Sequence, residues 1–315
     1  VDKSPESPFF GQIYTNNFIK SGNAGNGLYA YDQTYTRLNS APYRGYPNPG
    51  TTYRIAVGPM GKVWIAEWAD ANSGVYIADP ADLTKPFTQF FVGTRDGDGL
   101  FTNDGAKVGS STPGVAVGGT GADTKVYVAN EDMGNDVAVY QIGQPDGSLV
   151  YEWNKAPSYS LAVGKYLLNT DIAVAAGKDG GAWCSQRRGQ GNNTKNVPSL
   201  LYVTRDGNVT FNSGEGDFPL LLTGTGGGGF AVSADQSLVA VGELKGIVKL
   251  FSVTWAGDVP TLSLIGSFQS DVANKSGNLF EMNFDYAGNL ICSGAKLGVY
   301  SIPTAENLTT TPARN

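Results

Sequence analysis

Short apolar segments alternate with glycine- and aspartate-containing turns along the chain, and five pairs of such segments follow one pattern. The third residues of the first segments lie 60, 57, 58 and 52 positions apart. This near-constant spacing of short strands predicts a β-propeller, in which small sheets repeat around an axis. The pairs are Arg54–Val57 with Val63–Ala66, Gly114–Val117 with Val126–Ala129, Asp171–Val174 with Trp183–Ser185, Gly229–Val232 with Leu238–Val241, and Glu281–Phe284 with Leu290–Ser293.

A third apolar segment follows each pair, and most copies carry a looser fourth. Four antiparallel strands form a propeller blade, with the first strand innermost. The third segments are Gly74–Asp79, Val137–Tyr140, Leu200–Val203, Ile247–Phe251 and Leu297–Tyr300, and the clearest fourth segments are Phe87–Val92 and Leu262–Phe268.

The N-terminal part of the chain matches the repeat only from its second strand. Gly11–Asn16 matches a second strand and Gly27–Asp32 a third. We therefore expect one all-β domain over residues 1–315, a six-bladed β-propeller with four-stranded antiparallel blades. The two chain ends are expected to close the ring, because an open sheet edge favours aggregation. The expected blades cover about residues 9–48, 52–92, 112–165, 170–222, 228–270 and 278–301, followed by a terminal tail.

Composition agrees with a turn-rich β domain and excludes some partners. Glycine supplies 43 of the 315 residues, and only 16% are charged. The net charge of −6 argues against nucleic acid, whose recognition needs a basic surface. No apolar run reaches the ~18 residues of a membrane-spanning helix. We expect a monomer.

The chain contains no histidine. This excludes Ser-His-Asp and Cys-His nucleophile pairs, histidine-ligated zinc and histidine general-base catalysis. Carboxylates, lysine, tyrosine or a hard metal with oxygen ligands remain for chemistry. The sequence therefore favours a binding protein that requires no cofactor over an enzyme.

The two cysteines, Cys184 and Cys292, occupy the same place in two blades that are not neighbours. Their Cα atoms are expected to lie beyond the ~7 Å limit for a disulfide. Both are predicted to be free, buried thiols that act as small apolar side chains.

Parts of the second and third blades resemble the NHL repeat. The similarity rests on a glycine-aspartate loop, an inner strand beginning Thr-Pro-Gly, and an asparagine-led third strand. It implies a six-bladed propeller and a binding module of the bacterial secreted or cell-surface type. Asn130 departs from the pattern, because the family usually has aspartate there. The matching segments are Gly93–Ala106, Thr112–Val117, Lys125–Asn130 and Asn135–Tyr140.

The innermost strands of a propeller line a central channel. Charged residues near the start of these strands suggest a binding site at one mouth of that channel. Arg54, Asp171 and Glu281 are expected to converge there. The arrangement is similar to that of gluconolactonase-type propellers, which hold a divalent metal through Glu, Asn and Asp near this mouth; the Glu-Gly-Pro opening of that family is missing. Solvated rim charges or structural ion pairs are the alternative interpretation. Further polar residues end second strands at a similar level: Glu67, Asn130, Glu131 and Glu243.

The loop from residue 96 to residue 104 is the best candidate for a metal site. Its oxygen donors suit Ca²⁺, which takes six to eight oxygen ligands. No glutamate closes the loop at the spacing of an EF-hand, and a glycine-aspartate turn without metal is the alternative. The candidate ligands are Asp96, Asp98, Asn103 and Asp104.

Aromatic residues are dense near the N-terminus, and three of them fall in connections between strands. Tyr43, Tyr46 and Trp68 are therefore candidates for an exposed surface that binds a glycan or a protein.

These observations predict an extracellular, cell-surface or periplasmic propeller that binds a glycan or protein ligand at one face. The alternative is a divalent-metal-dependent hydrolase or lactonase that uses the carboxylates at the channel mouth.

Overall fold

The computed structural model describes residues 1–17, 27–43, 45, 52–67, 74–92, 94–95, 101–103, 106–108, 114–129, 137–151, 157–161, 163, 172–186, 200–213, 225–273 and 277–302. The chain divides into two compact units, Val1–Ala162 (unit 1) and Val163–Asn315 (unit 2). Among the described residues, no helix has the length and apolar character needed to cross a membrane. The helices in this part are short 3-10 turns: η1 (Pro59–Gly61), η2 (Gly121–Asp123), η3 (Lys178–Gly180) and η4 (Leu244–Gly246).

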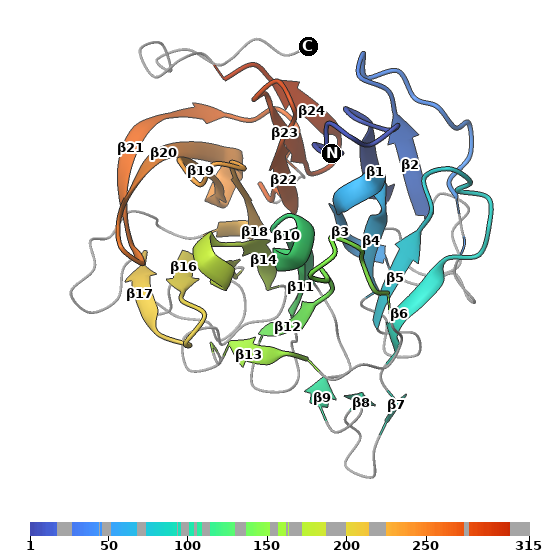
Figure 1. Ribbon diagram of the computed structural model, residues 1–315. Coiled ribbons are helices and arrows are strands. Elements are labelled where there is room, and N and C mark those ends of the chain that lie inside the picture. The colour runs from blue at the N-terminus through green and yellow to red at the C-terminus, as the bar shows by residue number, and fades with distance from the viewer. Residues whose placement is uncertain are drawn as a thin grey trace. The chain divides into compact units, whose positions relative to one another are not determined.

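Unit 1 contains two four-stranded antiparallel sheets and two smaller ones (Figure 1). A three-stranded sheet forms within the stretch that was expected to be a glycine-aspartate loop. The strands of the four-stranded sheets are β3 (Thr52–Val57), β4 (Val63–Glu67), β5 (Gly74–Ala78) and β6 (Thr88–Val92), then β10 (Gly114–Gly118), β11 (Lys125–Ala129), β12 (Val137–Gln141) and β13 (Tyr159–Leu161). The smaller sheets are β1 (Ile13–Asn17) with β2 (Gly27–Tyr31), and β7 (Thr94–Arg95), β8 (Phe101–Asn103) and β9 (Ala106–Val108).

Unit 2 contains two four-stranded sheets and one three-stranded sheet, again with strands in chain order. The first is β14 (Ala173–Ala176), β15 (Ala182–Ser185), β16 (Leu200–Val203) and β17 (Val209–Asn212). The second is β18 (Thr225–Val232), β19 (Leu238–Glu243), β20 (Ile247–Ala256) and β21 (Val259–Gln269). The third is β22 (Glu281–Phe284), β23 (Leu290–Ser293) and β24 (Leu297–Tyr300).

This succession of small antiparallel meanders is a β-propeller fold with four-stranded blades, as the sequence predicted. The expected number of blades is wrong, because five sheets of the described chain have the blade form instead of six. They are β3–β6, β10–β13, β14–β17, β18–β21 and β22–β24. The segment expected as the first blade contributes only the pair β1–β2.

The side chain of Asn39 takes part in the hydrogen bonds along the second edge of β2. Its Oδ1 accepts a hydrogen bond of 2.9 Å from the Ala30 amide, and its Nδ2 donates one of 3.2 Å to the Leu28 carbonyl. The Ala30 amide is therefore bonded by a side chain, whereas Leu28 keeps both backbone hydrogen bonds to Tyr43. Backbone pairing with β2 is reduced to single bridges, Leu28 with Tyr43 and Tyr31 with Arg37.

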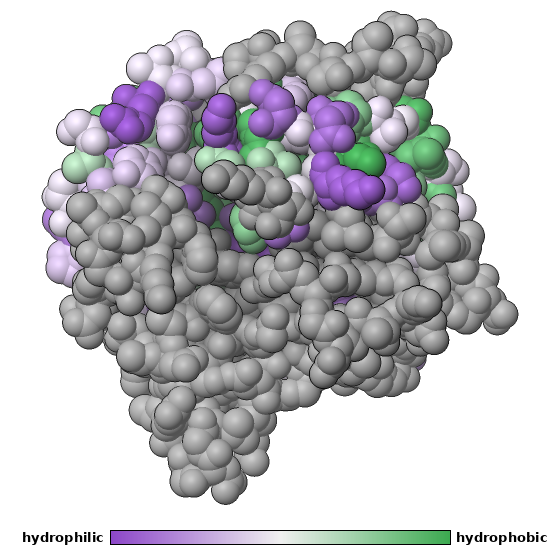
Figure 2. Space-filling view, turned by 180° about the vertical axis from the view of Figure 1, so that it is seen from behind, coloured by the Kyte–Doolittle hydropathy of each residue, from purple (hydrophilic) through white to green (hydrophobic). Residues whose placement is uncertain are grey.

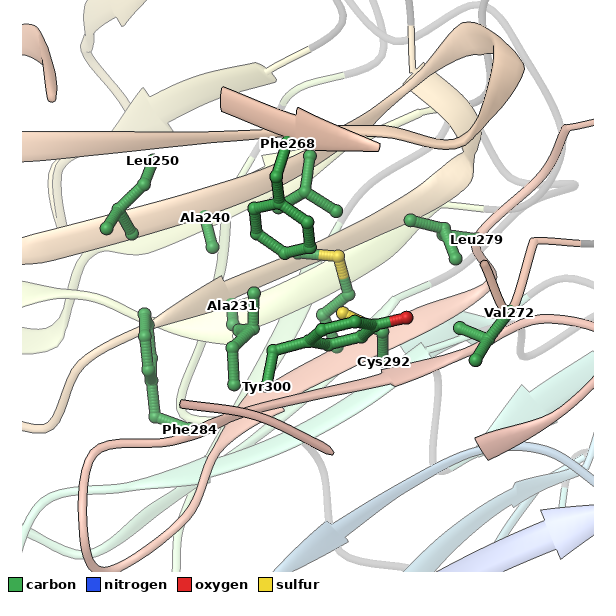
Figure 3. Close-up of a cluster of buried hydrophobic side chains, with 12 residues drawn as sticks. Ala231, Ala240, Leu250, Phe268, Val272, Leu279, Phe284, Cys292 and Tyr300 are labelled. Carbon is green, nitrogen blue, oxygen red and sulfur yellow. The ribbon is translucent and has the colours of Figure 1, made fainter. Parts of the chain in front are cut away.

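The core of each unit lies between successive sheets. In unit 1, one cluster joins β1–β2 to β3–β6 and another joins β3–β6 to β10–β13. In unit 2, one joins β14–β17 to β18–β21 and another joins β18–β21 to β22–β24. Figure 3 shows the last of these, where Phe268 and Leu250 of one blade meet Tyr300 and Cys292 of the next. Blades buried on both faces explain the near-continuous apolar character of their inner strands.

A small residue on the inner strand faces a large ring on the second strand in three blades. The opposed pairs are Ala56 with Trp64, Ala116 with Tyr127, and Ala175 with Trp183. Both tryptophans are fully buried. Alternation of small and large side chains lets neighbouring sheets interdigitate at the density of a protein interior.

The hairpin β20–β21 is longer than its counterparts and reaches the preceding blade. The Thr210 hydroxyl donates a hydrogen bond of 2.7 Å to the Asp258 carbonyl, and Lys178 Nζ donates one of 3.0 Å to the Gly257 carbonyl. Val253 and Leu262 are buried against the same preceding blade. The tip of this hairpin therefore fastens two blades of unit 2 together.

Candidate binding site at one end of the blades

The start of an inner strand and the end of the second strand lie at the same end of a blade, because the two strands are antiparallel. We call this the entry end. In unit 1, Arg54 lies opposite Ala66 and Thr52 opposite Glu67. In unit 2, Thr225 lies opposite Glu243 and Glu281 opposite Ser293. Residues that start inner strands and end second strands therefore share one location in each blade.

The predicted site residues that are described do not form an exposed rim. Arg54 is only 4% exposed, and Glu281 is half-buried. Tyr43 is also half-buried and packs against the cluster between β1–β2 and β3–β6. Arg54 belongs to unit 1 and Glu281 to unit 2, so their convergence stays a prediction.

Other predicted site residues lie outside the described residues. These are Asp171, Tyr46 and Trp68 of the proposed ligand site, and Asp96, Asp98 and Asp104 of the proposed metal loop. Asn103 is the last residue of β8, where it pairs with Ala106 of β9. The metal loop therefore also stays a prediction.

The entry end of the β3–β6 blade holds two buried groups of opposite charge. Glu67 ends β4 with no exposed surface, and Arg54 lies near the start of the adjacent strand β3. The Glu67 carboxylate also affects the pKa of Tyr76 on β5. Burial first, and then the charge of Glu67, raise the pKa of the Tyr76 phenol to about 12. The Glu67 carboxylate therefore acts on Tyr76 through its charge, although burial has the larger effect.

The entry end of the β18–β21 blade repeats the arrangement with a lysine as the cation. Glu243 ends β19, and its Oε1 lies 3.0 Å from Nζ of Lys249 on β20. The Glu243 side chain is 5% exposed and the Lys249 side chain 22%. The ion pair is therefore anchored inside the blade, with the ammonium group nearer to water. Glu67 and Glu243 were expected at the ends of second strands from the sequence, whereas Lys249 was not.

The β14–β17 blade carries uncharged polar groups at the same place. Ser185 ends β15 and Gln186 follows it, and both are fully buried. Their equivalence to Glu67 and Glu243 could have been found by aligning the second strands. Polar side chains at this position thus recur in three blades whose strands are otherwise largely apolar.

A metal site would need several ligand side chains close together, and the described residues of the entry ends offer few. Among them, no group of three acidic or cysteine side chains could hold an ion. The Lys249 ammonium already neutralises Glu243 at the distance of a direct ion pair.

Both cysteines are free and buried, which confirms the prediction made from the sequence. Burial raises the pKa of the Cys184 thiol to about 12 and raises that of Cys292 as well. Neither is a thiolate at neutral pH, so neither is a nucleophile.

Comparisons with known proteins place the chain by its fold. The sequence matches no protein family and no curated protein. A protein from Lactobacillus plantarum is similar in structure at 14% identity, with a TM-score of 0.55 over 96% of this chain and 82% of that one. The periplasmic gluconolactonase of Pseudomonas aeruginosa is similar at 15% identity, with a TM-score of 0.52 and the same coverage.

A protein of unknown function from Bacteroides thetaiotaomicron is also similar, at 14% identity and with a TM-score of 0.51. That similarity covers 91% of this chain and 66% of the other. Likeness at such low identity shows the fold and no more, because one fold hosts many functions. Fold and comparisons together define the class as an all-β propeller.

Proposed function

We propose that this protein is a binding propeller for a hydroxyl-rich ligand, such as a glycan, which it recognises at the entry ends of its blades. The observation that carries the proposal is the recurrence of buried polar side chains at the ends of β4, β15 and β19. Burying such groups is costly unless they are hydrogen-bonded or paired. Glu243 is paired with Lys249, and the ammonium group is the more exposed of the two, so it is the group that a ligand would reach.

Charge and geometry favour hydroxyl groups as the ligand chemistry. In unit 1, Glu67 would accept hydroxyl protons and Arg54 would donate to hydroxyl or carbonyl oxygens. In unit 2, Glu243 and Lys249 would take the same two roles. Hydrogen bonds to charged groups are shorter and stronger than neutral ones. A protein-binding surface would instead need exposed aromatic anchors, and the described residues at the entry ends are polar. An extracellular, cell-surface or periplasmic location is part of this proposal.

Glycan-array screening followed by calorimetry on the best ligand tests the proposal. Glu67→Gln and Glu243→Gln should each weaken binding at least tenfold, because the amide loses a charge-assisted acceptor. Asp235→Asn is the control, since Asp235 lies in the turn between β18 and β19 at the opposite end of its blade. Unchanged affinity in both glutamine variants, with folding intact, would place the site elsewhere.

A divalent-metal-dependent hydrolase or lactonase is the competing function. It draws support from the shared fold of the Pseudomonas aeruginosa enzyme and from the carboxylates at the entry ends. The ion pair of Glu243 with Lys249 speaks against it, because the ammonium group already neutralises the carboxylate. Calorimetric titration with Ca²⁺, Mg²⁺, Mn²⁺ and Zn²⁺, followed by lactone-hydrolysis assays, distinguishes the two. Stoichiometric metal binding with metal-dependent hydrolysis would favour the enzyme.

A further inference from the structure

The outer strand of the β18–β21 blade is unusually long. β21 has 11 residues, whereas the outer strands β6, β13 and β17 have 5, 3 and 4. In the described part of the chain, β21 is the last strand of its sheet and pairs along its length with β20 alone. Its other edge therefore presents a long row of backbone donors and acceptors.

This edge lacks two of the features that keep sheet edges apart, short length and charged residues. Natural proteins protect edge strands by making them short or by adding charges, prolines or bulges. The segment Val259–Gln269 contains no charged residue, in a chain whose net charge is −6. Its protective features are Pro260 near one end and a register shift beside Ile265. Two copies of the strand can therefore meet without charge repulsion.

The exposed apolar side chains of β21 lie where a symmetric pairing would use them. Val259 and Leu264 are 45% and 56% exposed, and Leu264 has the highest exposure among the large apolar side chains described. The register shift interrupts the alternation of the strand and leaves Leu264 exposed between buried Leu262 and Phe268. Leu264 is also the central residue of the 11-residue strand.

We propose that β21 pairs antiparallel with β21 of a second copy of this chain, about a two-fold axis at Leu264. A two-fold interface must be self-complementary, and antiparallel pairing about the central residue meets that condition. Leu264 then faces its own copy, Thr261 faces Ser267, and Val259 faces Gln269. All these contacts are uncharged. This proposal differs from the monomer expected from the sequence, and it is independent of the proposed ligand site.

The interface comprises one strand from each chain and is smaller than those of stable dimers, which bury about 1,200–2,000 Å². The dimer should therefore dissociate on dilution. Figure 2 shows hydrophilic and hydrophobic residues interspersed over the coloured part of one face.

Sedimentation velocity over a range of concentrations tests the proposal. The wild type should shift from monomer to dimer with rising concentration. Leu264→Lys places a charge on the axis against its own copy and should weaken association at least tenfold. Thr254→Lys is the matched control, because Thr254 is exposed on the same hairpin but lies on β20, away from the free edge. It should associate as the wild type does.

Disulfide trapping provides a second readout that does not depend on stability. Opposed residues of antiparallel strands have Cα atoms about 4.5–5.5 Å apart, within the range that a disulfide spans. Leu264→Cys should form a covalent dimer under mild oxidation, whereas Thr254→Cys should not. The native thiols are buried and do not interfere. A wild type that stays monomeric at all concentrations, or equal trapping by both cysteine variants, would overturn the proposal.

Discussion

Nε1 of Trp183 donates a hydrogen bond of 3.1 Å to Oε1 of Gln236, and this bond joins two successive blades of unit 2. Gln236 also donates from Nε2 to the Ala176 carbonyl and accepts at its backbone carbonyl from Trp255 Nε1. Trp64 holds the matching position in unit 1, but its buried Nε1 has no hydrogen-bond partner in the described structure. The two equivalent tryptophans therefore differ in hydrogen bonding: the indole N–H of Trp183 has an acceptor and that of Trp64 has none in the described structure.

Gln236→Ala should lower the free energy of unfolding by about 1–3 kcal/mol, because it leaves the buried indole N–H of Trp183 without an acceptor. Urea denaturation measures the loss. A double-mutant cycle with Trp183→Phe provides the control, since contacting residues couple by about 0.5–3 kcal/mol. Purely additive losses would show that the bond contributes nothing.

Lys249→Met should destabilise the protein by about 2 kcal/mol, because the carboxylate of Glu243 loses its counter-ion inside the blade. Fully buried pairs lose about 3–5 kcal/mol when one partner is removed, and the partly exposed ammonium reduces this value. Adding Glu243→Gln should recover part of the loss.

Lys85→Met is the control for this prediction. Lys85 pairs with Asp82 at 3.4 Å, but its side chain is 71% exposed. Exposed pairs contribute between about 0 and 1 kcal/mol, so this variant should melt close to the wild type. Equal losses in Lys85→Met and Lys249→Met would mean that burial of the Glu243 pair has no energetic effect.

Stability should fall at alkaline pH through Tyr76, whose pKa is raised from 10.0 to about 12. The neutral phenol is favoured in the folded state, so the unfolded chain releases its proton first. The contribution of Tyr76 is fully present below pH 10 and is lost as the pH rises toward 12. Denaturation curves at several alkaline pH values should show a smaller loss for Tyr76→Phe. Parallel losses in both proteins would assign the effect to other groups.

A disulfide-exchange reagent at about pH 8 should leave the native protein unlabelled and should titrate two thiols after denaturation without reductant. Both thiols are buried, and burial raises the pKa of Cys184 to about 12. Low thiolate content and lack of access both suppress the reaction. Rapid labelling of the folded protein would contradict the burial of these strands.

The hydrophobic pattern predicted the strands well where apolar residues are consecutive. Glu281–Phe284, Leu290–Ser293 and Leu297–Tyr300 have the predicted bounds. The hairpin β20–β21 is longer than predicted. In its additional part, Val253 and Trp255 alternate with polar residues and do not form the consecutive apolar run on which the prediction relied. The segment expected as the first blade is less regular than its apolar pattern suggests. Beyond β2 the backbone pairs at single bridges, Leu28 with Tyr43 and Tyr31 with Arg37, and the Asn39 side chain bonds the Ala30 amide.

The sequence predicted where along the strands the candidate site residues lie, but not how deeply they are buried or which residues they contact. The repeat placed Arg54 near the start of an inner strand, as observed, yet its burial depends on how neighbouring strands cover it. The partnership of Glu243 with Lys249 depends on the η4 turn, which folds β20 back along β19. Such a contact follows from strand register, and sequence spacing alone does not give it.

Each buried cluster formed by the described residues joins two successive sheets, and this gives each unit the energetics of a one-dimensional array. In such an array stability is a sum of terms within sheets and terms between nearest neighbours. A cavity made in the cluster around Phe268 and Tyr300 should therefore loosen β18–β21 and β22–β24 together. Amide hydrogen exchange would then be faster in those two sheets, while β14–β17, which is one interface further away, keeps most of its protection.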